Sequence, residues 1–158
     1  MSLDRRSYEG RPAGNHRPYV SEQEREDVRQ DCEQDAVRTG GCLCGAVRYS
    51  VRGEPLHVGR CHCADCRKES GSAFTVYGQW PREAFDLSGE LATYDGRSFC
   101  PRCGSRLVCL NGAAVEVRIG SLDDALFGLQ PEAEIWIKRR EPWLGPVGGA
   151  SQHEENRH

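Results

Sequence analysis

The order of apolar and polar residues in the middle of the chain is typical of short β-strands. Several runs alternate apolar with polar residues or are rich in β-branched and aromatic residues, as half-buried strands are. These runs are 46–51, 73–79, 91–94, 106–110, 115–119 and 134–137. Glycine-containing turn signals separate them, and Asn111-Gly112 between two apolar runs predicts a hairpin. The pattern contains no long amphipathic helix, so it predicts a small all-β domain with mostly antiparallel strands.

The two ends of the chain differ in composition from this middle part. The N-terminal residues are polar and charged, and the composition changes at Gly40-Gly41. The charged stretch 21–38 is compatible with a solvated helix. The sequence therefore predicts a flexible polar tail over 1–37, one β domain over 38–145 and a second polar, loose tail over 146–158.

Composition narrows the classes of function. A length of 158 residues fits one domain with a tail, and a formal net charge of −3 gives no electrostatic reason to expect a nucleic-acid partner. The chain shows no signal peptide and no apolar run near the ~18 residues of a membrane span. We therefore expect a soluble cytoplasmic protein with neither nucleic acid nor membrane as partner. In a reducing compartment, nine cysteines indicate metal ligands or reactive thiols rather than disulfides.

Seven of the cysteines form three clusters along the sequence. They are Cys42-Leu43-Cys44, then Cys61-His62-Cys63-Ala64-Asp65-Cys66, then Cys100-Pro101-Arg102-Cys103. Zinc prefers thiolates in a tetrahedral arrangement, and cysteine pairs on tight turns present two sulfurs to one ion. A glycine follows Cys44 and another follows Cys103, which permits such turns.

The seven cysteines divide as four plus three. Cys61, Cys63 and Cys66 are close enough in sequence to surround one ion, which leaves Cys42, Cys44, Cys100 and Cys103 for a second zinc. A site with four thiolates is closed, and closed zinc sites are structural, whereas three protein ligands leave one position open for chemistry. The alternative is that both sites are structural, with Cys109, His57 or Cys32 as the fourth ligand of the three-cysteine site. His62, between two predicted ligands, is expected to point away from the ion, and Cys109 to be a buried small hydrophobic residue.

The chain resembles the glutathione-dependent formaldehyde-activating enzymes, also called the GFA or centromere-protein-V domain family. The resemblance covers about residues 38–145 and lies in five motifs in the same order and spacing. These are Gly40-Gly41-Cys42-Leu43-Cys44-Gly45-Ala46-Val47-Arg48-Tyr49, Cys61-His62-Cys63-Ala64-Asp65-Cys66-Arg67-Lys68, Gly71-Ser72-Ala73-Phe74, Phe99-Cys100-Pro101-Arg102-Cys103-Gly104 and Gly120-Ser121-Leu122-Asp123-Asp124.

This resemblance implies small stacked β-sheets around zinc, an architecture shared with a Rab-binding exchange chaperone and with methionine-R-sulfoxide reductases. It implies structural zinc at Cys42, Cys44, Cys100 and Cys103, and an active-site zinc at Cys61, Cys63 and Cys66. The implied activity is that of a carbon–sulfur lyase, joining formaldehyde to glutathione or reversing that step. The sequence departs from the family pattern at Glu134, where the family often has a histidine.

Three hypotheses for function follow. In the first, a glutathione-like thiol binds at the open zinc, with Arg60, Arg67 and Lys68 attracting its negative charge and Ser72 donating a hydrogen bond. Ordinary solvated-surface roles for these basic residues and for the serine remain alternatives. In the second, the domain is a non-catalytic, zinc-stabilised module for protein binding. The third is a redox thiol protein like the methionine-R-sulfoxide reductases. It is disfavoured because the zinc of that family uses two CxxC pairs, whereas this chain has a single isolated CxxC pair.

Overall fold

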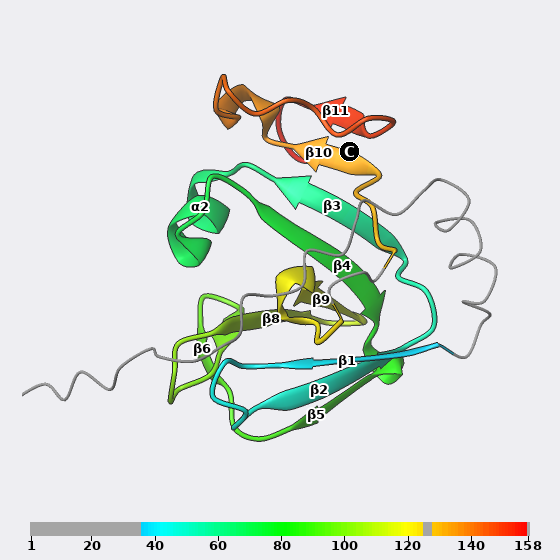
Figure 1. The fold of residues 1–158 in the computed structure, drawn as a ribbon, viewed down its shortest axis with the longest axis vertical. Helices are drawn as coiled ribbons and strands as arrows, with labels where there is room; N and C mark the ends of the chain where they lie inside the picture. The colour runs from blue at the N-terminus through cyan, green and yellow to red at the C-terminus, as the bar shows by residue number, and fades with distance from the viewer. Residues whose placement is uncertain (1–35, 125–127, 158) are drawn as a thin grey trace, which may run out of the picture. The chain divides into compact units, whose positions relative to one another are not determined.

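The computed structural model describes residues 36–124 and 128–157 and contains two β-sheets (Figure 1). A three-stranded sheet is formed by β1 (Val37–Gly41), β2 (Arg48–Arg52) and β5 (Phe85–Ser88), in the order β1-β2-β5, with antiparallel pairing throughout. The predicted N-terminal tail up to residue 35, Cys32 and most of the helix expected within 21–38 lie outside the described residues, whereas the last residues of that stretch, Val37 and Arg38, belong to strand β1. All six predicted strand runs are present, and the prediction of a mostly antiparallel β domain is confirmed.

The larger sheet has eight strands in the order β11-β10-β3-β4-β9-β8-β7-β6. Its members are β3 (His57–Cys61), β4 (Thr75–Pro81), β6 (Ala92–Tyr94), β7 (Arg97–Phe99), β8 (Arg106–Asn111), β9 (Ala114–Arg118), β10 (Ala133–Ile135) and β11 (Ser151–His153). The hairpin predicted at Asn111-Gly112 joins β8 to β9, with Asn111 opposite Ala114. The pairings of β10 with β3 and with β11 are parallel.

One α-helix, α2 (Ala64–Ser70), occurs in the described part of the chain, together with 3₁₀ turns at Arg82–Ala84, Ile119–Ser121 and Ile137–Arg139. The helix was not predicted from the sequence, since it is short and has no buried residue, and it lies in the connection between the paired strands β3 and β4. No helix among the described residues is both long and apolar enough to cross a membrane.

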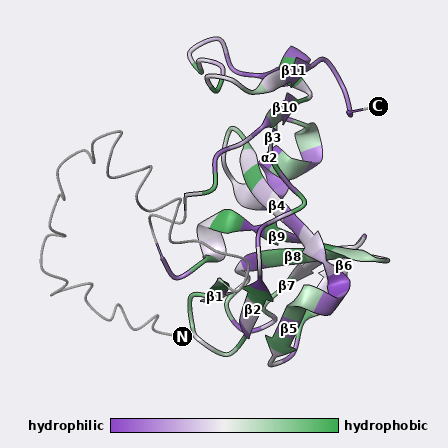
Figure 2. Ribbon diagram, turned by 90° about the vertical axis from the view of Figure 1, so that its right-hand side faces the viewer, coloured by the Kyte–Doolittle hydropathy of each residue, from purple (hydrophilic) through white to green (hydrophobic). Residues whose placement is uncertain are grey.

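The core lies between the three-stranded sheet and the central strands of the larger sheet. Tyr49 and Phe85 from the smaller sheet share one hydrophobic cluster with Trp80 and Leu107 from the larger one. Figure 2 shows the hydrophobic colour concentrated in β2, β5 and β8. Gly78 is required beneath Trp80, because a Cβ at Gly78 would lie 2.5 Å from the indole ring. This packing lies toward the C-terminal end of β4, whereas the cysteine-bearing segment 61–66 precedes the other end of the strand, where Cys61 pairs with Thr75.

The C-terminal segment is bound to the larger sheet. The sequence predicts a loose polar tail over 146–158, whereas in the structure β11 pairs with β10 over three residue pairs. Trp136 donates its backbone N–H to the carbonyl of Glu155 and its indole N–H to Asn156. Trp136 itself adopts a left-handed conformation with φ of 59°, which is strained for a residue with a side chain. The order of this segment could not be predicted from its polar composition, because hydrogen bonds rather than apolar burial hold it.

Candidate metal centres and the adjoining hollow

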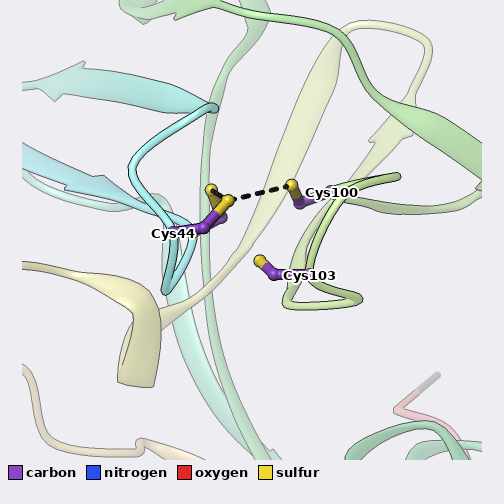
Figure 3. Close-up of side chains that lie close together, drawn as sticks. Cys44, Cys100 and Cys103 are labelled. Carbon is purple, nitrogen blue, oxygen red and sulfur yellow. Dashed lines mark hydrogen bonds between the residues drawn. The ribbon is translucent and has the colours of Figure 1, made fainter. Parts of the chain in front are cut away.

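The first candidate centre is the four-cysteine cluster, formed by Cys42, Cys44, Cys100 and Cys103. The four Sγ atoms all lie within 4.8 Å of one another. Cys42 and Cys44 follow β1, and the other pair follows β7, so two turns distant in sequence face each other (Figure 3). The structure therefore brings together the four residues that the sequence predicted as one site.

The two turns of this cluster have the same local construction. In each, a glycine in the left-handed region donates its N–H back to the carbonyl of the first cysteine: Gly45 to Cys42 at 3.0 Å and Gly104 to Cys100 at 2.8 Å. The N–H of Val47 donates to the Cys42 sulfur at 3.2 Å. Backbone donors aimed at sulfur stabilise thiolates, which is the form that binds metal.

The distances between sulfurs fit a tetrahedral zinc. Four sulfurs at ~2.3 Å from one ion lie about 3.8 Å apart. Here Cys42 Sγ lies 3.5 Å from Cys44 Sγ, and Cys44 Sγ lies 3.8 Å from Cys100 Sγ. The hydroxyl and the backbone N–H of Ser105 lower the pKa of Cys103 to about 5. The donor set and its spacing are thus those of a closed thiolate site.

The second candidate centre is the three-cysteine cluster, formed by Cys61, Cys63 and Cys66. Cys61 ends β3, Cys63 is the N-cap of α2, and Cys66 lies in the first turn of that helix. Their Sγ atoms also lie within 4.8 Å of one another. The N–H of Cys66 donates to Cys63 Sγ at 3.4 Å, so the cysteine performs the capping role that serine or aspartate often has.

These three thiols lie close together, with Cys61 buried and Cys63 and Cys66 partly buried. The hydrogen bond from the neighbouring Cys61 sulfur, followed by burial, raises the pKa of Cys66 well above its usual range. Burial likewise raises the pKa of Cys63. Three sulfurs held this close together fit a bound cation, because a divalent charge removes the repulsion between the thiolates.

Two of the three predicted candidates for a fourth ligand, His57 and Cys109, are not part of this cluster, and the third, Cys32, lies outside the described residues. His57 interacts with Glu132 and Arg157, and Cys109 lies between the guanidinium groups of Arg106 and Arg118, 3.6 and 3.5 Å from their nearest nitrogens. In the described part of the chain, this cluster has three His, Cys, Asp or Glu donors, which are the three cysteines themselves. Cys109 is buried as predicted, but its environment is charged rather than apolar.

His62 points away from the sulfurs, as the sequence predicted. Its ring is fully buried, lies 6.0 Å from the ring of Phe74, and places Nε2 3.0 Å from the carboxylate of Glu134. Arg60 reaches the same carboxylate, with Nη2 2.6 Å from Oε2. The prediction that Arg60 is a surface cation for substrate is therefore wrong, since its β3 position turns it into the protein interior beside β10.

Helix α2 is anchored at its other end by Glu69. This carboxylate, 9% exposed, accepts from Arg97 at 3.0 Å and Arg106 at 2.9 Å, and it also pairs with Arg118. The arginines come from β7, β8 and β9, so the helix that carries Cys66 is tied to three strands of the larger sheet. Glu69 was not predicted as a buried anchor, because a glutamate in a charged stretch of sequence gives no sign of burial.

A hollow of about 680 Å³, which we call the α2 hollow, lies along this helix. Its lining residues are Ala64, Arg67, Lys68, Gly71, Ser72, Ala73, Arg139, Glu141 and Trp143. Three of them, Arg67, Lys68 and Ser72, were predicted from the sequence as candidates for substrate binding. The side chains of Arg139, Glu141 and Trp143 were not predicted. Arg67 pairs with Glu141 and donates to the carbonyl of Arg139 at 3.2 Å, whereas Lys68 is exposed. The charged side chains that line the hollow are mainly positive, and it shares helix α2 with the three-cysteine cluster, although none of the three cysteines lines it.

The comparison with protein families agrees with this geometry. Residues 37–139 match the model of the family described as "Glutathione-dependent formaldehyde-activating enzyme". The matched range includes all seven cysteines of the two clusters and all of α2. It ends at Arg139, so Glu141 and Trp143 of the hollow lie beyond the match.

Proposed function

The chain belongs to the family of glutathione-dependent formaldehyde-activating enzymes, and we propose that it is a zinc-dependent carbon–sulfur lyase acting on the adduct of a glutathione-like thiol with a small aldehyde such as formaldehyde. The observation that carries the proposal is the unequal number of sulfurs in its two clusters. The four-cysteine cluster is proposed to hold a structural zinc. The three-cysteine cluster is proposed to hold the zinc of the active site, because three ligands leave one position for substrate.

The reaction requires a thiol that loses its proton and an aldehyde carbon that accepts sulfur. A zinc ion bound by three thiolates lowers the pKa of a thiol at its fourth position or polarises a carbonyl oxygen. In the synthetic direction the C–S bond forms, the π electrons of the carbonyl go to its oxygen, and the proton lost by the thiol ends on that oxygen. The lyase direction breaks the C–S bond and returns the proton to sulfur.

The chain's own residues supply the binding part of this function. Glutathione carries two carboxylates, and the α2 hollow offers Lys68, Arg139 and Arg67 within one surface. Arg67 is already paired with Glu141, so Lys68 and Arg139 are the stronger candidates for a substrate carboxylate. Ser72 lies at the rim and offers a hydroxyl for a neutral hydrogen bond. This arrangement supports an anionic thiol as substrate.

The direct test mixes purified zinc-loaded protein with glutathione and formaldehyde. The rate of adduct formation is followed by NMR exchange spectroscopy against the uncatalysed rate and against the Cys63→Ser variant. The proposal predicts acceleration by the wild type and none by the variant. A rate equal to the uncatalysed one would contradict the assigned reaction and would favour a zinc-stabilised module for protein binding.

A further inference from the structure

Glu134 on β10 is a charged residue in the interior of the larger sheet. Its side chain has no exposed surface, yet it accepts hydrogen bonds from Arg60 at 2.6 and 3.0 Å and from His62 at 3.0 Å. Burial acts to raise its pKa, but donors led by the N–H of Val147, His62 and Arg60 lower the pKa to about 2. The group is therefore a carboxylate at neutral pH, kept ionised by the donors around it.

One contact of this carboxylate leads to the three-cysteine cluster. His62 stands between Cys61 and Cys63, and its backbone N–H donates to the carbonyl of Ile135 at 3.1 Å. Its ring nitrogen Nδ1 is buried without a hydrogen-bond partner among the described residues. The bond from Nε2 to Glu134 is thus the polar contact that sets the ring orientation. Fixing the ring and main chain of His62 also fixes the direction in which its two cysteine neighbours present their sulfurs.

Other contacts lead to the wall of the α2 hollow. Arg60, held by Glu134, donates to the carbonyl of Gly145 at 2.7 Å, and Glu134 itself accepts from the N–H of Val147. Arg140 reaches the same carboxylate at 3.5 Å. The segment between Arg140 and Gly145 carries Glu141 and Trp143, which line the hollow. The two features of the proposed site are therefore attached to one buried charge.

We propose that Glu134 is a positioning residue: through His62 it sets the geometry of the three-cysteine cluster for metal, and through the 140–147 segment it places the wall of the α2 hollow. The part that concerns substrate rests on the proposed function, whereas the part that concerns metal does not. Partners bonded directly to metal ligands orient them, and their loss typically lowers metal affinity by about 10- to 100-fold. Glu134 acts one residue further out, through His62, so we expect an effect near the lower end of that range.

The experiment is a cobalt(II) titration of the full chain, in which thiolate-to-cobalt charge-transfer absorption reports each cluster. The spectrum of Cys63→Ser identifies the bands of the three-cysteine cluster by their loss. We expect Glu134→Gln to weaken cobalt binding at that cluster by about tenfold and to leave the four-cysteine bands unchanged. Glu132→Gln, an exposed partner of His57 on the same segment, is the matched control and is expected to change neither.

A second pair of variants keeps the test decisive if Glu134→Gln fails to fold. His62→Leu removes the donor to Glu134 while Arg60 still pairs with the carboxylate, and His62→Gln restores an N–H donor at the same place. The expected order of affinity at the three-cysteine cluster is wild type, then His62→Gln, then His62→Leu. Equal weakening at both clusters, no weakening at either, or His62 variants that do not fold would overturn the proposal, since each indicates a purely structural role.

The same variants separate this inference from the proposed function. If the wild type fails to accelerate adduct formation but the cobalt order holds, the lyase assignment is wrong and the positioning role of Glu134 stands. If the wild type is active and Glu134→Gln also raises KM for glutathione, the link to the hollow is supported. Full activity with unchanged KM and unchanged cobalt spectra in Glu134→Gln contradicts the positioning role alone.

Discussion

The Sγ atoms of Cys44 and Cys100 lie 3.8 Å apart although 56 residues separate them along the chain. Cys44 belongs to the turn after β1 in the smaller sheet, and Cys100 to the turn after β7 in the larger one (Figure 3). A metal ion held between these turns would join the two sheets beside the hydrophobic cluster, to which Cys42 and Cys100 belong. Closing so long a loop also removes conformational freedom from the unfolded chain, which favours the folded state.

Replacement of Cys103 by serine is expected to unfold the domain. Apparent binding free energies of structural zinc, about 10–16 kcal/mol, equal or exceed the ~5–15 kcal/mol stability of a typical domain. Thermal unfolding followed by near-UV circular dichroism measures the effect, and zinc content is determined on the same sample. A variant that unfolds cooperatively at the wild-type temperature would show that this cluster does not hold the fold.

Replacement of Cys63 by serine is expected to reduce activity strongly and stability only slightly. Activity should fall by at least about 100-fold because one ligand of the reactive zinc is lost. The unfolding temperature should fall far less than in Cys103→Ser, since serine is a favoured N-cap and keeps the acceptor for the N–H of Cys66. The two variants are compared in one adduct assay and one melting experiment, and equal destabilisation would contradict the division of roles.

A chelator is expected to remove the two zinc ions in two phases. The ion with an open position is accessible to an incoming ligand, whereas four protein sulfurs shield the other. Zinc release measured with a colorimetric indicator should therefore show a fast phase with loss of activity and a slow phase with loss of tertiary structure. A single phase in which both properties disappear together would count against distinct sites.

Reversal of charge at Lys68 should weaken substrate binding without affecting the fold. Lys68→Glu is expected to raise KM for glutathione by about three- to tenfold, with a smaller effect at high salt, because an exposed charge contributes about 1 kcal/mol or less. Arg52→Glu serves as the control, since Arg52 is an exposed arginine of β2 that pairs with Asp86. A similar KM in the two variants would remove the α2 hollow from the binding surface.

Loss of the carboxylate at Glu69 should destabilise the domain by about 3 kcal/mol, because removing one partner of a buried ion pair leaves the others uncompensated. The matched control is Asp65→Asn on the same helix. Asp65 is 68% exposed and pairs with Arg97 at 3.2 Å, so its loss should cost less than ~1 kcal/mol. Urea unfolding of both variants gives the comparison, and equal costs would show that the Glu69 cluster does not anchor α2.

The sequence was most informative where spacing alone determines proximity. The cysteines of each cluster occupy short turns marked by glycine, so their grouping as four and three was predictable and is reproduced by the structure. The hairpin at Asn111-Gly112 was predictable for the same local reason. Strands β1 and β3 were missed because glycines interrupt their apolar pattern, and α2 was missed because it is short and carries no buried residue.

The ionic contacts of the site depend on tertiary structure and gave no signal in sequence. Arg60 and Glu134 are 74 positions apart and become neighbours only because β10 pairs in parallel with β3. Glu134 stood out as a departure from the family pattern, but its pairing with His62 follows from register rather than composition. The residues Glu141 and Trp143 in the wall of the α2 hollow were likewise not predictable, since the order of the C-terminal segment comes from backbone pairing with β10.

The central claim is that the two metal centres have different numbers of protein sulfurs. X-ray absorption at the zinc edge, combined with zinc content per chain, measures this directly. The account predicts about two zinc ions per chain, an average of three to four sulfurs per zinc, and a lighter scatterer completing the shell. Four sulfurs on every zinc, or a folded and active chain that retains no zinc, would contradict it.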